Sequence, residues 1–402
     1  PCLFSLHMKK YFISMMAGML LSGHSVLSQN LSSSDSLSQK STEQSSFLQV
    51  PVGKGNLSFN LYGDFGYVFG PQKTHTYFDP IEGETVTTYG RRDFTSYPLY
   101  ANQFSLSYGF IQGQYELKDK LKFKFAFHTG HIVDALYLEE SPSTRIIREL
   151  SLYYHLNPKW ALEIGIFPSY FGAEIVLNKE NLHATRAYIA DFTPDYEAGV
   201  RLHYKADEYN TFSAMVLNGW QVIKETNTTK AFALAWSLNK PGKIVGNWNL
   251  MFADEQPLSA AQPLFRHYQN IYFRIWLSER LMILPVLDAM VEQKPGDQVK
   301  GWNKMIAPAF SARYGLSEKF GVAGRYEHIY DPKSLIPELR TNAPSGWQNQ
   351  AVTLTFEYLP LNLVTFRIEG KYGTHKDAVF RNGSNQFVKE DWYGIVSSSF
   401  YF

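Results

Sequence analysis

Apolar and polar residues alternate with a period of two along most of the chain from Asn56 onward. In the segment 121–128, for example, Leu and Phe at the odd positions alternate with Lys122, Lys124, an alanine and His128. Successive side chains of a β-strand point to opposite faces of the sheet, so this pattern predicts strands with one apolar and one polar face. Because no sustained helical pattern with end caps follows residue 28, the sequence predicts an all-β protein.

The alternating segments number about 16, including weaker patterns at Leu281–Met290 and Met305–Tyr314. Short and long connections alternate strictly between them. Seven are short, at 118–120, 157–159, 206–210, 239–242, 278–279, 316–318 and 359–362; eight are long, at 70–100, 131–144, 168–194, 219–229, 253–265, 291–301, 331–347 and 374–388. Short turns at one rim and long loops at the other are typical of a transmembrane antiparallel β-barrel whose termini both lie at the short-turn, periplasmic rim.

The two faces of each strand have different roles in such a barrel. Lipid offers the backbone no hydrogen-bonding partner, so the sheet must be closed, with its apolar side chains outward. The polar side chains then line a lumen, and a barrel of about 16 strands is wide enough for an aqueous channel unless a loop blocks it. The alternative is a soluble β-sandwich, whose core the same aromatic side chains could fill, although a sandwich would not explain the alternation of short and long connections.

Composition supports the membrane interpretation. Of the 402 residues, 16% are aromatic, and aromatic side chains near strand ends, such as Trp160, Tyr204 and Phe402, suit the two membrane interfaces. The net charge of +1 gives no electrostatic basis for binding nucleic acid. We therefore expect outer-membrane lipids, and no nucleic acid, among the partners.

The N-terminal region has the features of an export signal. Met8-Lys9-Lys10 and the mostly apolar run 11–27 give it a basic start and a short apolar core. We expect a signal peptide with upstream residues at 1–28, a flexible segment rich in Ser and Gln at 29–55, and the barrel at 56–402; an ordinary N-terminal helix is the alternative. The only cysteine, Cys2, precedes the signal, so the exported chain would have no disulfide, cysteine nucleophile or thiolate metal site.

Five short strings of the sequence resemble one family when they are taken in order. They are Gly165-Ile166-Phe167-Pro168-Ser169-Tyr170-Phe171-Gly172-Ala173-Glu174, Thr193-Pro194-Asp195-Tyr196-Glu197-Ala198-Gly199-Val200-Arg201, Asn218-Gly219-Trp220, Gly324-Arg325-Tyr326-Glu327-His328-Ile329-Tyr330-Asp331-Pro332 and Phe366-Arg367-Ile368-Glu369-Gly370-Lys371-Tyr372. The chain thereby resembles the outer-membrane β-barrel porin-2 family of OmpL-like porins from about Gly165 onward, although the group's Tyr-Arg pair is replaced by Gly370-Lys371. A C-terminal strand that ends in Phe402 also resembles the insertion signal of outer-membrane barrels.

The resemblance implies a porin of the cell outer membrane. Such a protein is a water-filled channel for passive diffusion of small polar solutes and ions, and neither catalysis nor a cofactor is implied. Many 16-stranded porins are trimers, so a homotrimer is expected by analogy. Two other functions stay open: a surface structural or adhesive barrel that binds partners through its long loops, and a substrate-specific channel.

Charged residues of inward parity are the candidate channel-lining residues. They are Lys122, Lys124, Glu163, Glu197, Arg201, Arg274, Arg325, Glu327, Glu357, Arg367, Glu369 and Lys371. With Asp64 and Glu149 they make seven bases and seven acids, and Glu357–Arg367 and Arg325–Glu327 are close enough to pair. These rows either set a transverse field that orients solutes or simply keep the wall wet. The equal numbers do not predict strong ion selectivity.

The third long loop, Pro168–Pro194, is the candidate constriction. By similarity to general porins we expect it to fold inward and narrow the channel. Its candidate residues are Glu174, Lys179, Glu180, His183, Arg186 and Asp191. A surface loop packed on its neighbours is the alternative, and the first long loop, Gly70–Tyr100, competes for the same role.

The histidines do not form a recognisable catalytic or metal-binding pattern. His128, His155 and His203 have inward parity in mid-strand, which disfavours a Ser-His dyad on the lipid face. His131 lies near His128 without a carboxylate at zinc-site spacing, so no metal site is expected. Arg148 shares the outward parity of its apolar neighbours, which implies either a side chain that reaches the lipid headgroups or a shift in strand register.

Overall fold

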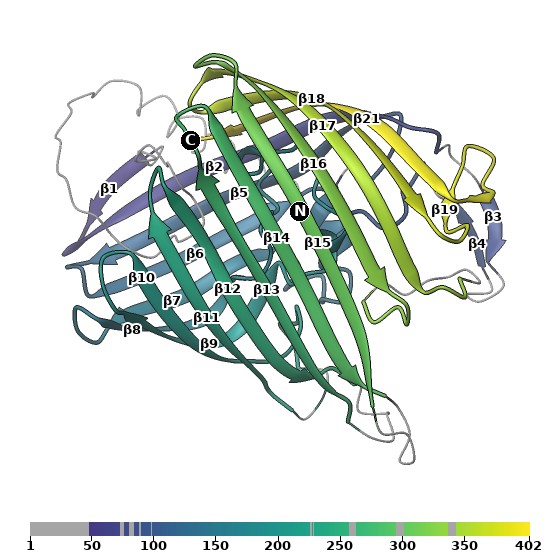
Figure 1. Ribbon diagram of the computed structural model, residues 1–402. Coiled ribbons are helices and arrows are strands. Elements are labelled where there is room, and N and C mark those ends of the chain that lie inside the picture. Colours follow the sequence, from purple (N-terminus) through teal and green to yellow (C-terminus); the bar gives the residue numbers. More distant parts are fainter. Residues whose placement is uncertain are drawn as a thin grey trace, which may run out of the picture. The chain divides into compact units, whose positions relative to one another are not determined.

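The computed structural model describes residues 48–72, 76–79, 84–87, 90–97, 99–225, 227, 229–256, 263–294, 301–336 and 343–402. The predicted signal peptide and most of the segment 29–55 lie outside these residues. The described chain forms a closed antiparallel barrel of 16 strands (Figure 1). β21 pairs with β2 and thereby closes the ring, as the alternation of polar and apolar residues predicts.

The barrel strands are long, and each pairs with its neighbour in the sequence. Their bounds are β2 (Gly55–Phe69), β5 (Phe104–Leu117), β6 (Leu121–Thr129), β7 (Ile147–His155), β8 (Trp160–Pro168), β9 (Tyr196–Lys205), β10 (Asn210–Leu217), β11 (Ala231–Lys240), β12 (Ile244–Asp254), β13 (Phe265–Trp276), β14 (Leu281–Gln293), β15 (Trp302–Gly315), β16 (Phe320–Asp331), β17 (Trp347–Leu361), β18 (Val364–His375) and β21 (Glu390–Tyr401). The two weaker patterns are therefore confirmed as β14 and β15.

One part of the segment 29–55 forms a strand. β1 (Leu48–Val52) forms a hairpin with the first residues of β2. The C-terminal strand ends where Phe402 exchanges backbone hydrogen bonds with Leu61, so the start of β2 extends past it. β1 covers this otherwise unpaired edge and satisfies its backbone polar groups.

Short turns and long loops alternate as predicted, and the loops contain the remaining elements. These are the hairpin of β3 (Thr76–Asp79) and β4 (Glu84–Thr87), helix α2 (His131–Leu136), the 3₁₀ helices η1 (Asn178–Glu180) and η2 (Ile189–Asp191), and the hairpin of β19 (Phe380–Arg381) and β20 (Phe387–Val388). The helices lie in loops, where the sequence has no period-two pattern. No helix among the described residues is long and apolar enough to cross a membrane.

The faces of the strands divide as their parity predicts. Outward side chains such as Leu354 and Ile368 are more than half exposed, whereas inward polar side chains such as Thr355 and Glu369 are buried. Arg148 is explained by a register shift, since Ala126 pairs with Glu149 while Phe127 pairs with Ile147. This β-bulge turns Arg148 inward, over the buried ring of Phe110 at 4.6 Å.

Candidate functional site

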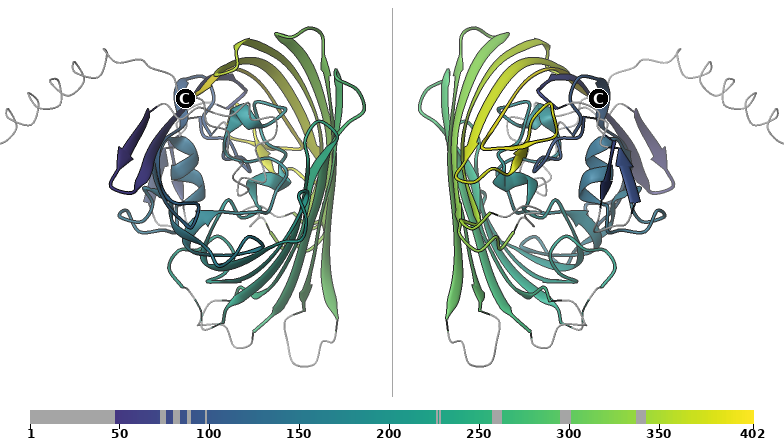
Figure 2. Two further views of the ribbon diagram at one scale, coloured as in Figure 1. Left: turned by 90° about the vertical axis from the view of Figure 1, so that its left-hand side faces the viewer. Right: turned by 90° about the vertical axis from the view of Figure 1, so that its right-hand side faces the viewer.

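The long connection between β8 and β9 folds into the barrel. This segment, Ser169–Asp195, is called the inner loop below and contains η1 and η2. Figure 2 shows its teal coils inside the ring of strands. Its contacts with β16, β17, β18 and β21 join residues far apart in the sequence, so the loop crosses the barrel interior.

Glu369 of β18 holds the middle of the inner loop. Its carboxylate accepts the backbone N–H of Ala184 at 2.6 Å and that of Thr185 at 3.0 Å, together with the Thr185 hydroxyl. The hydroxyl of Thr355 on β17 donates to the same carboxylate at 2.6 Å. Four donors therefore converge on one buried charge, which makes Glu369 a strong anchor for the loop.

Arg325 of β16 makes a second anchor. Its guanidinium pairs with Glu174 of the loop at 2.6 Å and donates to the carbonyl oxygens of Thr185 at 2.9 Å and Arg186 at 3.1 Å. It also lies 3.4 Å from Glu327 of the same strand, the pair predicted from the sequence. The guanidinium is thus bonded to both the wall and the loop.

Arg367 of β18 fixes the loop around η1. It donates to the carbonyl oxygens of Asn178 at 2.6 Å and Asn181 at 2.7 Å. Its charge is balanced by Glu357 at 2.7 Å, which confirms the predicted contact across the β17–β18 turn. Arg274 of β13, which is separated from β18 by four strands, donates to the carbonyl oxygen of Glu180 at 2.9 Å.

The end of the inner loop is bound near η2. The backbone N–H of Tyr188 donates to Glu327 at 2.6 Å. Lys371 pairs with Glu327 at 2.8 Å and lies 3.7 Å from the centre of the Tyr188 ring. The Tyr188 hydroxyl donates to Asp391 of β21 at 3.1 Å, so this tyrosine contacts β16, β18 and β21.

Charges within the inner loop also pair with each other. Arg186 binds Asp195 at 2.6 Å and Asp191 at 2.8 Å. Its guanidinium donates to the hydroxyl of Ser96 in the first long loop at 2.8 Å, and Tyr97 of that loop accepts the Asn178 side-chain amide at 2.8 Å. The first loop, predicted as a competitor for the constriction, therefore supports the inner loop from within the barrel.

His183 faces the wall in its neutral form. Burial, and then the positive charges of Arg325, Arg367 and Lys371, lower the pKa of this loop histidine well below its ordinary value of 6.5. Its Nδ1 lies 2.8 Å from the Thr355 hydroxyl. Because that hydroxyl donates to Glu369, it accepts from His183, which assigns the proton to Nδ1.

The wall opposite β16–β18 carries its own ion pairs. Lys122 pairs with Glu116 at 2.9 Å, and Lys124 lies 3.7 Å from Glu149. On β8 and β9, Arg201 pairs with Glu163 at 3.1 Å, whereas Glu197 accepts the hydroxyl of Ser169, the first residue of the inner loop, at 2.8 Å. These pairs keep buried charges compensated on both sides of the inner loop.

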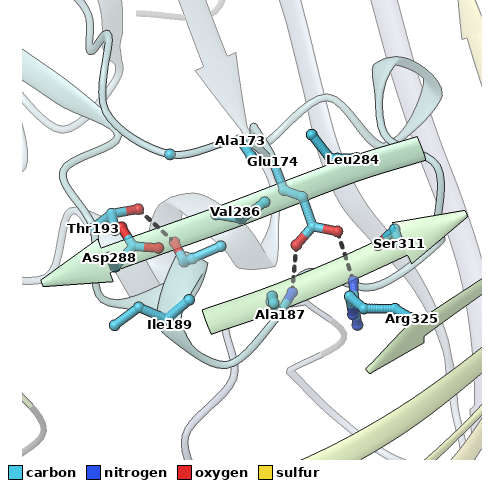
Figure 3. Close-up of a pocket in the computed structure, with 13 residues that line it drawn as sticks. Ala173, Glu174, Ala187, Ile189, Thr193, Leu284, Val286, Asp288, Ser311 and Arg325 are labelled. Carbon is cyan, nitrogen blue, oxygen red and sulfur yellow. Dashed lines mark hydrogen bonds and ion pairs between the residues drawn. The ribbon is translucent and has the colours of Figure 1, made fainter. Parts of the chain in front are cut away.

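A small cavity lies between the inner loop and strands β14 and β15 (Figure 3). Its lining includes Glu174, which bridges the N–H of Ala187 at 2.5 Å and Arg325. Leu284, Val286 and Asp288 line it from β14. Among the described residues, no cluster of three or more His, Cys, Asp and Glu side chains is arranged to hold a metal ion.

This architecture agrees with one family over most of the chain. Residues 64–401 match the family described as beta-barrel porin-2, OmpL-like. The chain belongs to this porin family. It is an outer-membrane porin, and its family and fold indicate a channel rather than an enzyme.

Solved structures with the same fold come from several organisms. The outer-membrane channel DcaP of Acinetobacter baumannii has a TM-score of 0.57 at 10% identity, with 89% of this chain and 100% of that chain covered. An anion-selective porin from Comamonas acidovorans has a TM-score of 0.56 at 8% identity, with 87% of this chain and 100% of that chain covered. OmpF of Salmonella typhi, in a complex with daunomycin, has a TM-score of 0.54 at 10% identity, with 88% of this chain and 100% of that chain covered. No curated protein matches the sequence of this porin.

The predicted site residues of this porin fall into two groups. One group bonds directly to the backbone or side chains of the inner loop: Glu197, Arg274, Arg325, Glu327, Arg367, Glu369 and Lys371. The other group pairs with wall residues: Lys122, Lys124, Glu163, Arg201 and Glu357. In the loop, Glu174, His183, Arg186 and Asp191 are bonded through their side chains. Lys179 and Glu180 contact the wall through their backbone, and their side chains are half-buried.

Several residues at the site are not apparent from the sequence pattern. Asp288, Asn270 and Tyr268 meet on the inner face of β13 and β14, where Tyr268 and Asn270 donate to the Asp288 carboxylate. The inward side of β14 is otherwise mostly apolar, with Met282, Leu284 and Val286, so its polar face is not visible as an alternation. The single aspartate at inward parity in β14 is the signal that points to this position.

Proposed function

We propose that this outer-membrane porin conducts small polar solutes and ions passively, through the space that the inner loop leaves inside the barrel. The observation that carries the proposal is the inner loop itself, which is bound across the interior by Glu369, Arg325 and Arg367. A loop held by several charged anchors sets a fixed, narrow size limit. The twelve wall charges predicted from the sequence act mainly through this loop and through each other.

Single-channel recording tests this proposal. The refolded barrel, residues 29–402, is inserted into a planar lipid bilayer, and current is recorded in potassium chloride. Stable, stepwise conductance is expected. Silence after repeated insertions of demonstrably folded protein would overturn the proposal and favour a surface barrel that binds partners through its loops. Saturable block by one class of solute would identify a substrate-specific channel instead.

The oligomeric state is a separate proposal. We expect a homotrimer by analogy with other 16-stranded porins. Chemical cross-linking of the detergent-solubilised barrel, followed by mass measurement, tests it. A species of three chains is expected, and a barrel that stays monomeric at all concentrations of cross-linker contradicts the analogy.

A further inference from the structure

The two sides of the inner loop meet the barrel wall differently. Toward β16, β17 and β18 the loop is attached by charged and backbone hydrogen bonds. Toward β14 and β15 it presents Ala173, Ala187 and Ile189, and a cavity of about 20 Å³ remains, which is room for a water molecule. The wall of β14 and β15 there is formed by Leu284, Val286, Ala309 and Ser311, with Asp288 as its charged side chain. Among the described residues, no hydrogen bond joins the loop to β14 or β15 themselves. The nearest attachments flank the cavity, from Gly172 N–H to Asn270 of β13 at 3.1 Å and from Glu174 to Arg325 of β16 at 2.6 Å.

We propose that the conducting passage runs between the inner loop and strands β14 and β15, and that Asp288 makes it prefer compact cations to anions. This inference rests on the proposed channel function. It adds the path that ions take and the charge that the channel prefers. The cations meant are of the size of an alkali ion or ammonium, because the passage at the loop is close to the width of one water molecule.

Asp288 is the group in the cavity whose charge has no cationic partner among the described residues. It is 1% exposed, and it lines the cavity. Its hydrogen bonds come from the neutral Tyr268 hydroxyl and from the Asn270 amide at 2.7 Å, and both are accepted by Oδ1. Neutral donors fix the carboxylate in place without cancelling its charge, so it attracts a passing cation.

The other charges around the cavity do not offset Asp288. Glu174 and Arg325 pair with each other at 2.6 Å, and Arg325 is further balanced by Glu327. Figure 3 shows the Glu174–Arg325 pair and Asp288 around the same cavity. The lining therefore contains two carboxylates and one guanidinium, which leaves an excess of negative charge in a poorly hydrated space.

Polar atoms beside the cavity indicate where water continues the path. The Asn247 amide and the Tyr272 hydroxyl are buried and lack hydrogen-bond partners among the described residues. Asn247 pairs with Tyr272 in register, and Tyr272 pairs with Val286 of the cavity lining. Buried polar groups are normally satisfied by protein or by ordered water, so the amide nitrogen and oxygen of Asn247 and the Tyr272 hydroxyl offer partners to water beside the cavity.

The test is the ratio of cation to anion permeability, read from the reversal potential of the refolded barrel in a potassium chloride gradient. The wild-type porin is expected to favour potassium. Asp288→Asn should move the ratio toward one, and Asp288→Glu should keep it above one. Asp64→Asn is the matched control, because Asp64 is also buried and bonded by two tyrosine hydroxyls but lies on β2, outside the cavity lining.

A second pair of variants tests the path without changing charge. Ala309→Leu narrows the cavity from β15 and should lower conductance several-fold, whereas Ala161→Leu, on the inner face of β8, should leave it nearly unchanged. An unaltered permeability ratio in Asp288→Asn, or a loss of conductance in Ala161→Leu alone, overturns the inference. Wild-type protein that does not conduct at all would instead contradict the proposed function.

Discussion

Charged residues inside this barrel have two roles: some keep the wall solvated, and others attach the inner loop to it. A buried charge is costly unless it is paired and hydrogen-bonded. Glu369 meets this condition only because the loop supplies Ala184 and Thr185 as donors. The loop in turn needs an acceptor for these N–H groups, so each stabilises the other.

Glu369→Gln should release the middle of the inner loop. An amide has one acceptor oxygen and presents N–H groups to the donors of Ala184 and Thr185, so bonds worth about 2–4 kcal/mol are lost. We expect trypsin to cut after Lys179 or Arg186 in the folded variant and single-channel conductance to rise. Glu279→Gln, in an exposed short turn, is the control. If the loop of the variant resists trypsin as well as the wild-type loop does, Glu369 is not its anchor.

Acid should loosen the same contact through His183. The histidine is neutral when bound, with a lowered pKa, while in a released loop it would titrate near its ordinary value of 6.5. The attachment is therefore at full strength above about pH 6.5 and weakens as the pH falls below it, by about 1.4 kcal/mol per pH unit. Conductance recorded at pH 7 and pH 5 should show more frequent loop opening at pH 5.

His183→Gln separates this effect from the surrounding charges. The neighbouring Glu369, Arg325, Arg367 and Lys371 remain, but the group that gains a proton in this pH range is removed. We expect the difference between pH 7 and pH 5 to shrink markedly in the variant. An identical pH response in wild-type and variant proteins would assign the effect to the carboxylates instead.

At the scale of elements, strand positions follow from the sequence more closely than strand details. Period-two alternation locates β6 and β18 because one face meets lipid and the other a polar interior. The alternation is weaker in β14, because apolar side chains such as Leu284 and Val286 lie on its inner face as well. The bulge at Arg148 leaves only an ambiguous trace in the sequence, since a single extra residue changes the parity of one side chain.

Gly165 of β8 should be intolerant of a side chain. Its φ is +134°, and a Cβ there would lie 2.1 Å from the carbonyl oxygen of Leu150. Gly165→Ala should therefore cost about 1–3 kcal/mol or more. Gly370→Ala is the matched control in β18, where a Cβ meets no atom within 4 Å. The temperature at which the folded band is lost on heat-modifiable gels should fall for the first variant alone; equal temperatures would show that β8 relaxes around the added methyl group.

At the scale of the whole molecule, the barrel could be predicted from the sequence but the arrangement inside it could not. Strand pairing joins neighbours in the chain, so local patterns carry it. The contacts of Glu174 with Arg325, or of Thr185 with Glu369, join residues that are distant in sequence. The charge pattern shows that these residues face inward, but not which partner each one meets. Asp288 is hidden for another reason, since the apolar side chains on the inner face of β14 leave no alternation to mark it.

The barrel and the inner loop should prove separable. Each strand is hydrogen-bonded to its neighbours without the loop, and a Cβ at Gly172 would lie 3.1 Å from the Thr193 hydroxyl, so the loop closes on itself at its base. Replacement of Ala173–Phe192 by a short Gly-Ser linker should leave a folded barrel, because the freed charges on β16 and β18 become hydrated instead of buried and unpaired.

Conductance of this loop-deleted barrel should rise several-fold, since the segment that fills the interior is gone. Its preference for cations should decline, because Asp288 would face a wide, hydrated lumen in which its field is screened. The same linker inserted between Ser278 and Glu279, at the short-turn rim, should change neither property. If the loop-deleted barrel folds but its conductance is unchanged, the ions pass elsewhere in the barrel. If it does not fold, the loop is part of the barrel's core.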